Sequence, residues 1–270
     1  MSGCWRLLHY TMIRMKDKPV GVVRRHRWDV PPTEARKIQG ELRTHWIGED
    51  AFGEIRTVAG LDASFVLTGS QALQKPAGHW RRLRETNRAI GCVVTYRFPE
   101  IEELERAYAV LPLRFPYVPG LLSFREIPVL LEALARLDRQ PDLLFCDAHG
   151  YAHPRRLGLA SHLGVVLDRP SIGCAKSILV GKHATLPAKA GSWVPLLDEA
   201  SGERIGAALR TRSIVRPVYV SQGHRISLET AVGLTLAVTD GFRIPRPTRD
   251  ADRFAGEIKR KVLNGQASEN

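Results

Sequence analysis

Two aspartates stand where apolar, strand-like segments end. Asp62 lies in the run 59–65, and Asp147 closes the run 142–147. An ionised carboxylate is costly in apolar surroundings unless it is paired or holds a cation. At the ends of neighbouring strands, two such groups would offer the oxygen ligands that Mg²⁺ prefers. The alternative is that each aspartate only ends its strand in a turn, where Asp is common.

Three further ionisable residues stand close to element ends. Glu126 closes the run Ser123-Phe124-Arg125-Glu126, which matches a helix capping box, and local pattern alone favours this capping role over a catalytic one. Lys176 follows the apolar run 172–175, where a lysine can neutralise a phosphate or simply extend its charged end to solvent. His224 stands at a strand-to-helix junction, where a lone histidine is more often structural than catalytic.

The run 147–156 is the densest polar stretch of the chain. It contains His149 and His153, and it ends with Arg155 and Arg156 before a helix. Loops after strand ends are where open α/β sheets place their chemistry. The arginines could hold phosphates or could be ordinary surface charges, and no partner ligands at zinc-site spacing stand nearby.

The run Phe115-Pro116-Tyr117-Val118-Pro119-Gly120 predicts a stiff loop with an aromatic tip. Its prolines restrict the backbone, and Gly120 allows close approach of another group. A rigid aromatic side chain can fill the gap left when a base leaves its stack. The competing interpretation is a plain proline turn with Tyr117 on the surface.

The composition limits the class of protein. Of 270 residues, 40 are Lys or Arg and 28 are Asp or Glu, which gives a net charge of +12 and a pI near 10.0. That balance favours a polyanion, either a nucleic acid or an anionic membrane surface. The four cysteines are scattered without a CxxC pair, which is typical of a protein in a reducing cytoplasm. Cys92, Cys146 and Cys174 stand in apolar surroundings, which favours buried thiols. No apolar run approaches the roughly 20 residues of a membrane span.

The hydrophobic pattern predicts a meander of strands followed by strands that alternate with helices, and hence a mixed sheet covered by helices. Residues 67–88 read as a loop or an elongated hairpin. The predicted strands are 57–65, 90–98, 104–113, 142–147, 171–175 and 218–221. The predicted helices are 31–46, 123–137, 157–167, 227–239 and 248–262. We expect one domain over residues 31–265, preceded by a basic, solvated arm over residues 1–30 whose order the composition leaves open.

The order and spacing of several motifs resemble the endonuclease V (deoxyinosine 3′ endonuclease) family, from about Ala59 to Thr248. This resemblance implies an α/β, ribonuclease-H-like mixed β-sheet flanked by helices. The matching motifs are Gly60-Leu61-Asp62, Pro116-Tyr117-Val118-Pro119-Gly120, Ser123-Phe124-Arg125-Glu126, the run 147–156, Gly173-Cys174-Ala175-Lys176, Gly223-His224-Arg225 and Pro245-Arg246-Pro247-Thr248-Arg249.

The resemblance also implies an activity. The chain would nick DNA at the second phosphodiester bond on the 3′ side of a deoxyinosine, leaving a 3′-hydroxyl and a 5′-phosphate. Mg²⁺, or Mn²⁺ in its place, would be bound by Asp62 and Asp147, with Glu126 completing the acidic cluster. Lys176 and His224 would assist at the scissile phosphate, and Tyr117 would be the wedge. The residues implied for the base pocket are Gly120, Leu122, Gly150, His153 and Leu159.

Two positions depart from the family pattern. Ala148 replaces a glycine, which would cost backbone freedom if that position needs a positive φ, and Cys174 replaces a valine. Three other functions stay open: a ribonuclease acting on inosine-containing RNA, a non-catalytic nucleic-acid binder, and a hydrolase of a small phosphorylated compound. The expected protein is a cytoplasmic monomer.

Overall fold

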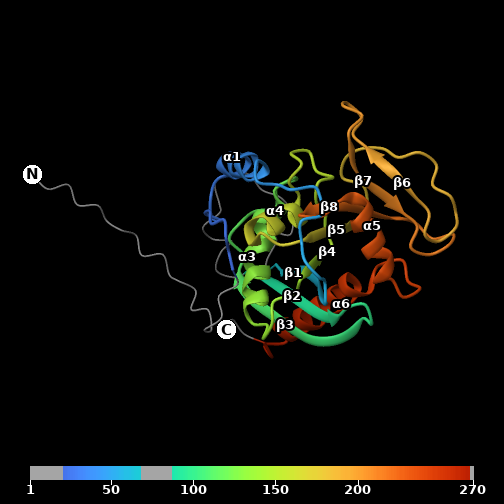
Figure 1. Cartoon of the computed structure of the whole chain (residues 1–270). Coiled ribbons are helices and arrows are strands. Elements are labelled where there is room, and N and C mark those ends of the chain that lie inside the picture. Colours follow the sequence, from blue (N-terminus) through green and yellow to red (C-terminus); the bar gives the residue numbers. More distant parts are fainter. Residues whose placement is uncertain (1–20, 68–86, 268–270) are drawn as a thin grey trace, which may run out of the picture.

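A computed structural model describes residues 21–67 and 87–267. Its centre is an eight-stranded sheet in the order β3-β2-β1-β4-β5-β8-β7-β6 (Figure 1). The strands β1, β4 and β5 run parallel to one another, and the remaining pairs are antiparallel. The strands are β1 (Thr57–Val66), β2 (Arg88–Arg97), β3 (Glu102–Pro112), β4 (Leu143–Cys146), β5 (Ser171–Ala175), β6 (Trp193–Leu197), β7 (Arg204–Leu209) and β8 (Val218–His224).

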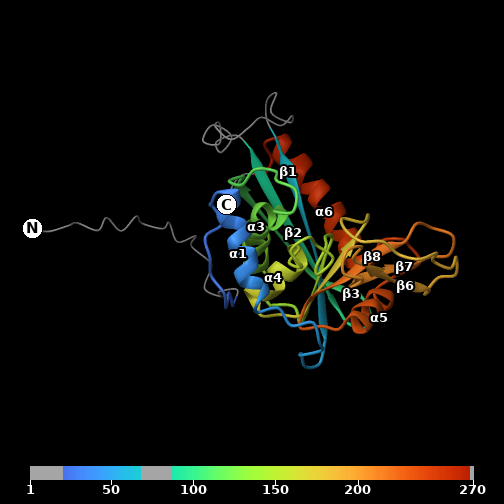
Figure 2. The same cartoon turned by 90° about the horizontal axis from the view of Figure 1, so that it is seen from above.

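Helices cover both faces of the sheet. Figure 2 shows α6 on one side of β1 and β2, with α1, α3 and α4 on the other. A central strand covered on both faces must be apolar throughout, and β4 accordingly reads Leu-Leu-Phe-Cys with every residue buried. The helices are α1 (Pro32–Arg43), α3 (Leu122–Ala135), α4 (Leu159–Leu167), α5 (Leu228–Ala237) and α6 (Arg246–Leu263).

Two core clusters fill the spaces between the layers. One joins α5 and α6 to the side chains of Val58, Phe145 and Ile172. The other joins α3 and α4 to the opposite face, where Leu61 and Leu144 point. On α6 the buried positions Ala251, Phe254, Ala255 and Ile258 follow helical spacing, which explains why this otherwise charged helix packs on the sheet.

The predicted fold class is confirmed, and two strands were missed. The edge pair β6 and β7 lies in a stretch to which we assigned no element. Only one residue of β6 is buried, so its pattern lacks a clear two-residue period. The pair occupies the end of the sheet farthest from β3 (Figure 1).

Part of the expected solvated arm packs on the domain. The backbone N–H of Val23 donates to the carbonyl of Val166 at 2.9 Å, Trp28 packs against the core, and Val30 is buried. Apolar side chains between the charges supply this contact, so residues 21–30 are not a free arm. Residues 1–20 and most of the predicted 67–88 loop, residues 68–86, lie outside the described ranges.

Cys92, Cys146 and Cys174 are free and buried, as expected. In the ranges 21–67 and 87–267, no helix is long and apolar enough to span a bilayer.

Candidate active site

The two predicted aspartates lie side by side at one edge of the sheet. Leu61 on β1 pairs with Cys146 on β4, so Asp62 and Asp147 both lie one residue beyond the last parallel pair, at the same level. Asp147 follows the end of β4 as predicted, but Asp62 does not end its strand, because β1 continues to Val66 in its pairing with β2. Because side chains alternate along a strand, Asp62 faces the same side as Val58, the side covered by α6. The parallel β4–β5 pair continues this edge toward Lys176.

Lys176 ties the cluster together. Its Nζ lies 2.6 Å from Asp147 Oδ2 and 3.2 Å from Asp252 Oδ2. Asp252 belongs to α6, and sequence reasoning missed it because an acid on a long charged helix carries no strand-end pattern. The sequence feature that could have identified Asp252 is its position about one helical turn after the motif Pro247-Thr248-Arg249.

The carboxylates strongly influence each other's ionisation. Burial, followed by the charges of Asp147 and Asp252, raises the pKa of Asp62 to about 7. Burial, and next the charge of Asp62, raises the pKa of Glu126 well above its ordinary value. Burial also raises the pKa of Asp147, although Lys176 opposes that shift. Four acids from β1, α3, the end of β4 and α6 therefore surround one region of negative potential.

The capping box that the sequence favoured for Glu126 does not form. Helix α3 begins at Leu122, and its cap residue, Leu121, makes no side-chain capping bond. Ser123 instead donates its hydroxyl to His162 Nδ1 at 2.9 Å. The Ser123 hydroxyl bonds a distant helix instead of capping α3. The Glu126 carboxylate therefore takes no part in a capping box and is available to the acidic cluster.

The donor set fits a hard divalent cation. All four candidate ligands are carboxylate oxygens, and Mg²⁺ and Ca²⁺ prefer oxygen donors. In the described part of the chain, no group of three or more His, Cys, Asp or Glu side chains is arranged to hold an ion as it stands. The positive charge that lies among these carboxylates is the ammonium of Lys176, which contacts two of them.

The structure does not bring His224 to this cluster. His224 pairs with Ser171 at the start of β5, whereas Lys176 follows the end of that strand, five residues further on and roughly 16 Å away at about 3.3 Å per residue. Its Nε2 donates to Asp168 Oδ1 at 3.1 Å, and its Nδ1 accepts from the backbone N–H of Ile47 at 3.2 Å. The ring is fully buried and joins structural elements, so the predicted role at the phosphate is not supported.

The proline loop holds its aromatic tip outward. Tyr117 is 65% exposed, whereas Phe115 at the base of the loop is buried. Arg125 donates to the carbonyl of Phe115 at 3.1 Å, and the N–H of Leu121 donates to the carbonyl of Val118 at 2.9 Å. The loop is fixed at both ends with its ring free, which is the arrangement that a wedge requires.

Gly120 and His153 are in direct contact. The carbonyl of Gly120 accepts from His153 Nε2 at 3.1 Å, from Gln39 Nε2 at 3.2 Å and from the guanidinium of Arg155. The backbone N–H of Arg155 donates to His153 Nδ1 at 3.2 Å, so the proton of the neutral ring is on Nε2. Burial, and next the charge of Arg155, lowers the pKa of His153 to about 4. His153 thus positions the Gly120 peptide, with neither ring nitrogen left for a base.

The other predicted pocket residues divide into two groups. Leu122 is 36% exposed at the start of α3, two residues after Gly120. Gly150 is buried against β8, where a Cβ would lie 2.1 Å from the carbonyl oxygen of Gln222, and Leu159 belongs to the core. Ala148, at the family's glycine position, is not among the residues with positive φ, so its β-carbon causes no strain there.

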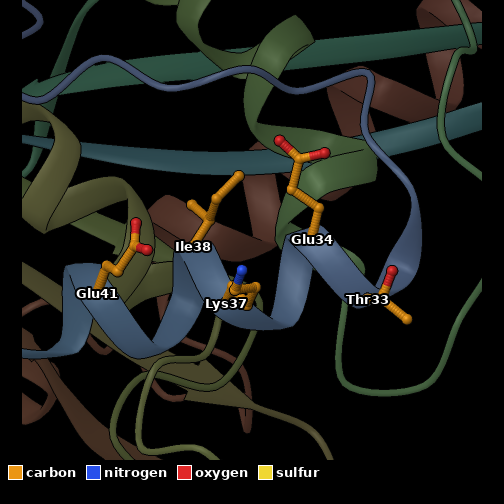
Figure 3. A pocket seen from close by; sticks show the side chains of 5 residues that line it. All are labelled: Thr33, Glu34, Lys37, Ile38 and Glu41. Carbon is orange, nitrogen blue, oxygen red and sulfur yellow. The ribbon is translucent and has the colours of Figure 1, made fainter.

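One surface hollow of about 550 Å³ is lined by residues at the start and along the length of α1 (Figure 3). It contains none of the cluster carboxylates, and its mixed charges give no basis for metal or phosphate chemistry. Its lining residues are Thr33, Glu34, Lys37, Ile38 and Glu41.

Comparison with known proteins gives a consistent result. The sequence model of the Endonuclease V family matches residues 40–253. An Endonuclease V of Roseiflexus castenholzii is 51% identical over 232 residues, which cover 86% of this chain and 95% of that relative. The crystal structure of Endonuclease V from Streptomyces avermitilis superimposes with a TM-score of 0.76 at 38% identity, covering 87% of this chain and 96% of that one.

A third similar structure contains nucleic acid. Ciona intestinalis Endonuclease V, in complex with a 24mer DNA containing an inosine followed by a ribo-adenosine, superimposes with a TM-score of 0.68 at 25% identity. The match covers 85% of this chain and 98% of that one. Together with these relatives, the mixed sheet and the acidic cluster at its edge define a nuclease of ribonuclease-H-like fold. The chain belongs to the Endonuclease V family.

Proposed function

We propose that this protein is a DNA repair endonuclease that nicks a strand at the second phosphodiester bond 3′ to a deoxyinosine. The observation that carries the proposal is the convergence of Asp62, Asp147 and Lys176 from three neighbouring parallel strands. Hydrolysis of a phosphodiester needs countercharge at the phosphate and an activated water. An acidic, partly buried cluster beside a lysine can provide both when it binds divalent ions.

Mg²⁺, with Mn²⁺ as a substitute, would be held by Asp62, Asp147 and Glu126, with Asp252 at the rim. When bound, it supplies Lewis-acid stabilisation of the phosphate and lowers the pKa of a water ligand. Lys176 keeps a positive charge beside Asp147 and places it where negative charge develops on the phosphate. Release of the 3′-oxygen leaves a 3′-hydroxyl, and the attacking oxygen stays on the 5′-phosphate.

Base recognition would use the rigid loop before α3. Tyr117 would stack in the space left by the extruded base, and the Gly120 backbone, held by three donors, would form one wall of the pocket. Leu122 provides an exposed apolar edge next to it. Gly150, His153 and Leu159 would support the pocket from beneath.

A cleavage assay tests the proposal. A labelled single strand with one inosine is incubated with Mg²⁺ or with a chelator, and the product length is compared with that of an undamaged strand. We expect a single product, cut at the second phosphodiester bond on the 3′ side of inosine. It should form only when the metal is present and only from the strand that contains inosine. Equal cutting of both strands, or no cutting at all, would overturn the proposal.

Asp147→Ala separates chemistry from binding. This variant is expected to lose cleavage while retaining strand binding, because it removes a carboxylate and not a cation. Unimpaired cutting by Asp147→Ala with Mg²⁺ would show that the acidic cluster is not the active site.

Inosine-containing RNA is the second candidate substrate. The Ciona intestinalis complex contains a ribo-adenosine after the inosine, which makes a 2′-hydroxyl at that position a specific point to test. Running the same assay with DNA, RNA and a DNA strand carrying one ribonucleotide there would rank the substrates.

A further inference from the structure

Two segments of the chain near β5, β7 and β8 carry basic residues and no acidic ones, and the acidic residues of this region lie at the turn between β6 and β7. The sequence holds no acidic residue between Asp168 and Asp198, and none between Glu203 and Glu229. Residues 211–217, here called the basic loop, lie in the connection from β7 to β8, inside the second of these stretches. Its Arg212 and Arg216 are exposed, and within the described residues neither forms an ion pair.

The basic loop also presents an unusual apolar residue. Ile214 is 87% exposed and has a φ of 65°. The left-handed region is strongly disfavoured for a β-branched residue, and Ile214 gains almost no burial in exchange. Strain of this kind persists only where the surroundings impose it, and it is frequent at binding sites.

The surroundings of the loop do impose this conformation. The N–H of Ile214 donates to the carbonyl of Ala188 at 2.9 Å, and Ser213 Oγ accepts from the N–H of Ala190 at 3.0 Å. The guanidinium of Arg210 donates to the carbonyls of Leu186 and Val215. The tip of the loop is therefore held in place with its side chains directed to solvent.

Arg243 connects the basic loop to the acidic cluster. Its guanidinium donates to the carbonyls of Arg216 at 3.0 Å and Pro217 at 2.8 Å, and to the carbonyl of Lys176 at 2.6 Å. The same positive charge acts on Asp147. Because β8 begins beside the end of β5, the loop continues the row of strand ends that carries Asp62, Asp147 and Lys176.

The proline loop, which carries Tyr117 and Gly120, and the basic loop lie on different sides of the acidic cluster. Gly120 and Leu122 belong to the α3 side of the sheet, whereas Arg243 lies between α5 and α6, which cover the other side. A strand whose base enters the pocket and whose cut bond lies at the cluster then continues toward the basic loop. Because the proposed cut lies on the 3′ side of the base in the pocket, the part of the strand that continues past the cluster is its 3′ side.

We propose that the basic loop binds the nucleic-acid strand on the 3′ side of the cut. Arg212 and Arg216 neutralise its phosphates, and Ile214 packs against a base or sugar. The direction of the strand rests on the proposed function, but the contact itself does not depend on catalysis. The partner chemistry is a single-stranded polyanion with apolar faces, to which cations and an exposed aliphatic side chain are complementary.

Equilibrium binding in chelator tests this, so that no cutting takes place during the measurement. Three inosine strands are compared by fluorescence anisotropy: one with long flanks, one shortened on the 3′ side to the cut, and one shortened on the 5′ side. For the double variant Arg212→Ala/Arg216→Ala, we expect affinity for the first and third strands to fall about tenfold. The slope of log affinity against log salt should decrease by roughly 1.4, since each phosphate contact in a single strand contributes about 0.7. Affinity for the strand lacking the 3′ flank should not change.

Two further variants make the result specific. Arg260→Ala/Lys261→Ala removes the same charge from exposed positions in the last turn of α6 and should show no flank dependence. Ile214→Asn should weaken binding of the 3′-flanked strands about fivefold while the midpoint of thermal unfolding stays the same or rises, because asparagine tolerates the left-handed region.

Equal losses on all three strands, a loss confined to the 5′ flank, or a fall in the unfolding midpoint of Ile214→Asn would overturn the proposal. Failure of the proposed function would appear separately, as a wild-type protein that binds these strands but does not cut at inosine when Mg²⁺ is added.

Discussion

At the scale of single residues, the raised pKa of Asp62 has a thermodynamic consequence. Its folded-state pKa is about 7, against an ordinary value of 3.8. Between these values the folded protein retains a proton that the unfolded chain releases. Ionising Asp62 therefore costs stability progressively as the pH rises through this window, and the whole cost is present above it.

Asp62→Asn is expected to stabilise the metal-free protein. At about pH 8 the gain in unfolding free energy should be roughly 2–4 kcal/mol, and near pH 4 it should vanish. Urea unfolding in chelator at the two pH values measures it. Adding Mg²⁺ should stabilise the wild type more than the variant, and a variant less stable than the wild type at the higher pH would contradict this account.

Tyr117 is expected to act through its ring. Tyr117→Ala should weaken binding to an inosine strand by about 1–3 kcal/mol, the contribution of one stacking contact. Tyr117→Phe, which keeps the ring, should bind nearly as the wild type does. Because the side chain is 65% exposed, neither change should alter the unfolding midpoint. Equal affinities of wild type and Tyr117→Ala for both inosine and undamaged strands would remove the wedge.

At the scale of elements, Asp168 joins three parts of the fold. It ends α4 with a φ of 53° and accepts from Arg225 on both oxygens, at 2.9 and 2.8 Å. It also contacts His224 and, at 3.5 Å, Arg24 of the N-terminal segment. The hydrogen bonds from the Arg225 guanidinium make the largest contribution to holding the pKa of this carboxyl well below its usual range.

Asp168→Asn is expected to destabilise the protein by about 1–3 kcal/mol near neutral pH. A depressed folded-state pKa gives stability that is present above the ordinary pKa of about 4 and is lost as the pH falls below it. The wild type should therefore lose this advantage in acid, and the difference between the two proteins should shrink below pH 4 or so. Asparagine also tolerates the left-handed backbone, so it isolates the charge. A difference that does not depend on pH would contradict the assignment.

At the scale of the whole molecule, the close approach of α6 to β1 completes the acidic cluster. A Cβ at Gly60 would lie 1.9 Å from the carbonyl oxygen of Pro247, in the first turn of α6. The glycine therefore sets the distance between sheet and helix. Asp252 follows on the same helix and reaches Lys176 only at that distance.

Gly60→Ala should lower the unfolding free energy by about 1–3 kcal/mol and should reduce cleavage of the remaining folded protein, because α6 has to move away. Gly53→Ala is the matched control, since nothing lies within 4 Å of its added Cβ, and it should stay within about 0.5 kcal/mol of the wild type. Thermal unfolding and the inosine cleavage assay measure the two effects. Full activity of Gly60→Ala would show that the position of α6 is not critical.

Local pattern predicted those parts of the fold that local physics controls. The apolar runs of β1, β4 and β5 were predicted because buried strands need them, and the acids in or after the runs of β1 and β4 indicated a metal-binding site, although β1 continues four residues beyond Asp62. The missed strand β6 lies at the sheet edge, where only one of its residues is buried and the two-residue period is weak. Its neighbour β7 is buried at five of six positions, so its burial does not alternate either. The same locality explains the error at Glu126, where a capping box matched within four residues but Ser123 bonds a helix far along the chain.

The sequence alone determined which chemistry this protein can carry out: acids and a lysine in or directly after apolar runs, a stiff aromatic loop and a large positive charge are properties of residue type and order. Only the tertiary structure decided which of these residues meet. It brought Asp252 to Lys176, kept His224 five residues along β5 from Lys176, and turned His153 toward the Gly120 carbonyl. Those outcomes depend on strand register and on helix–sheet distance, which packing over the whole chain fixes and no short segment encodes.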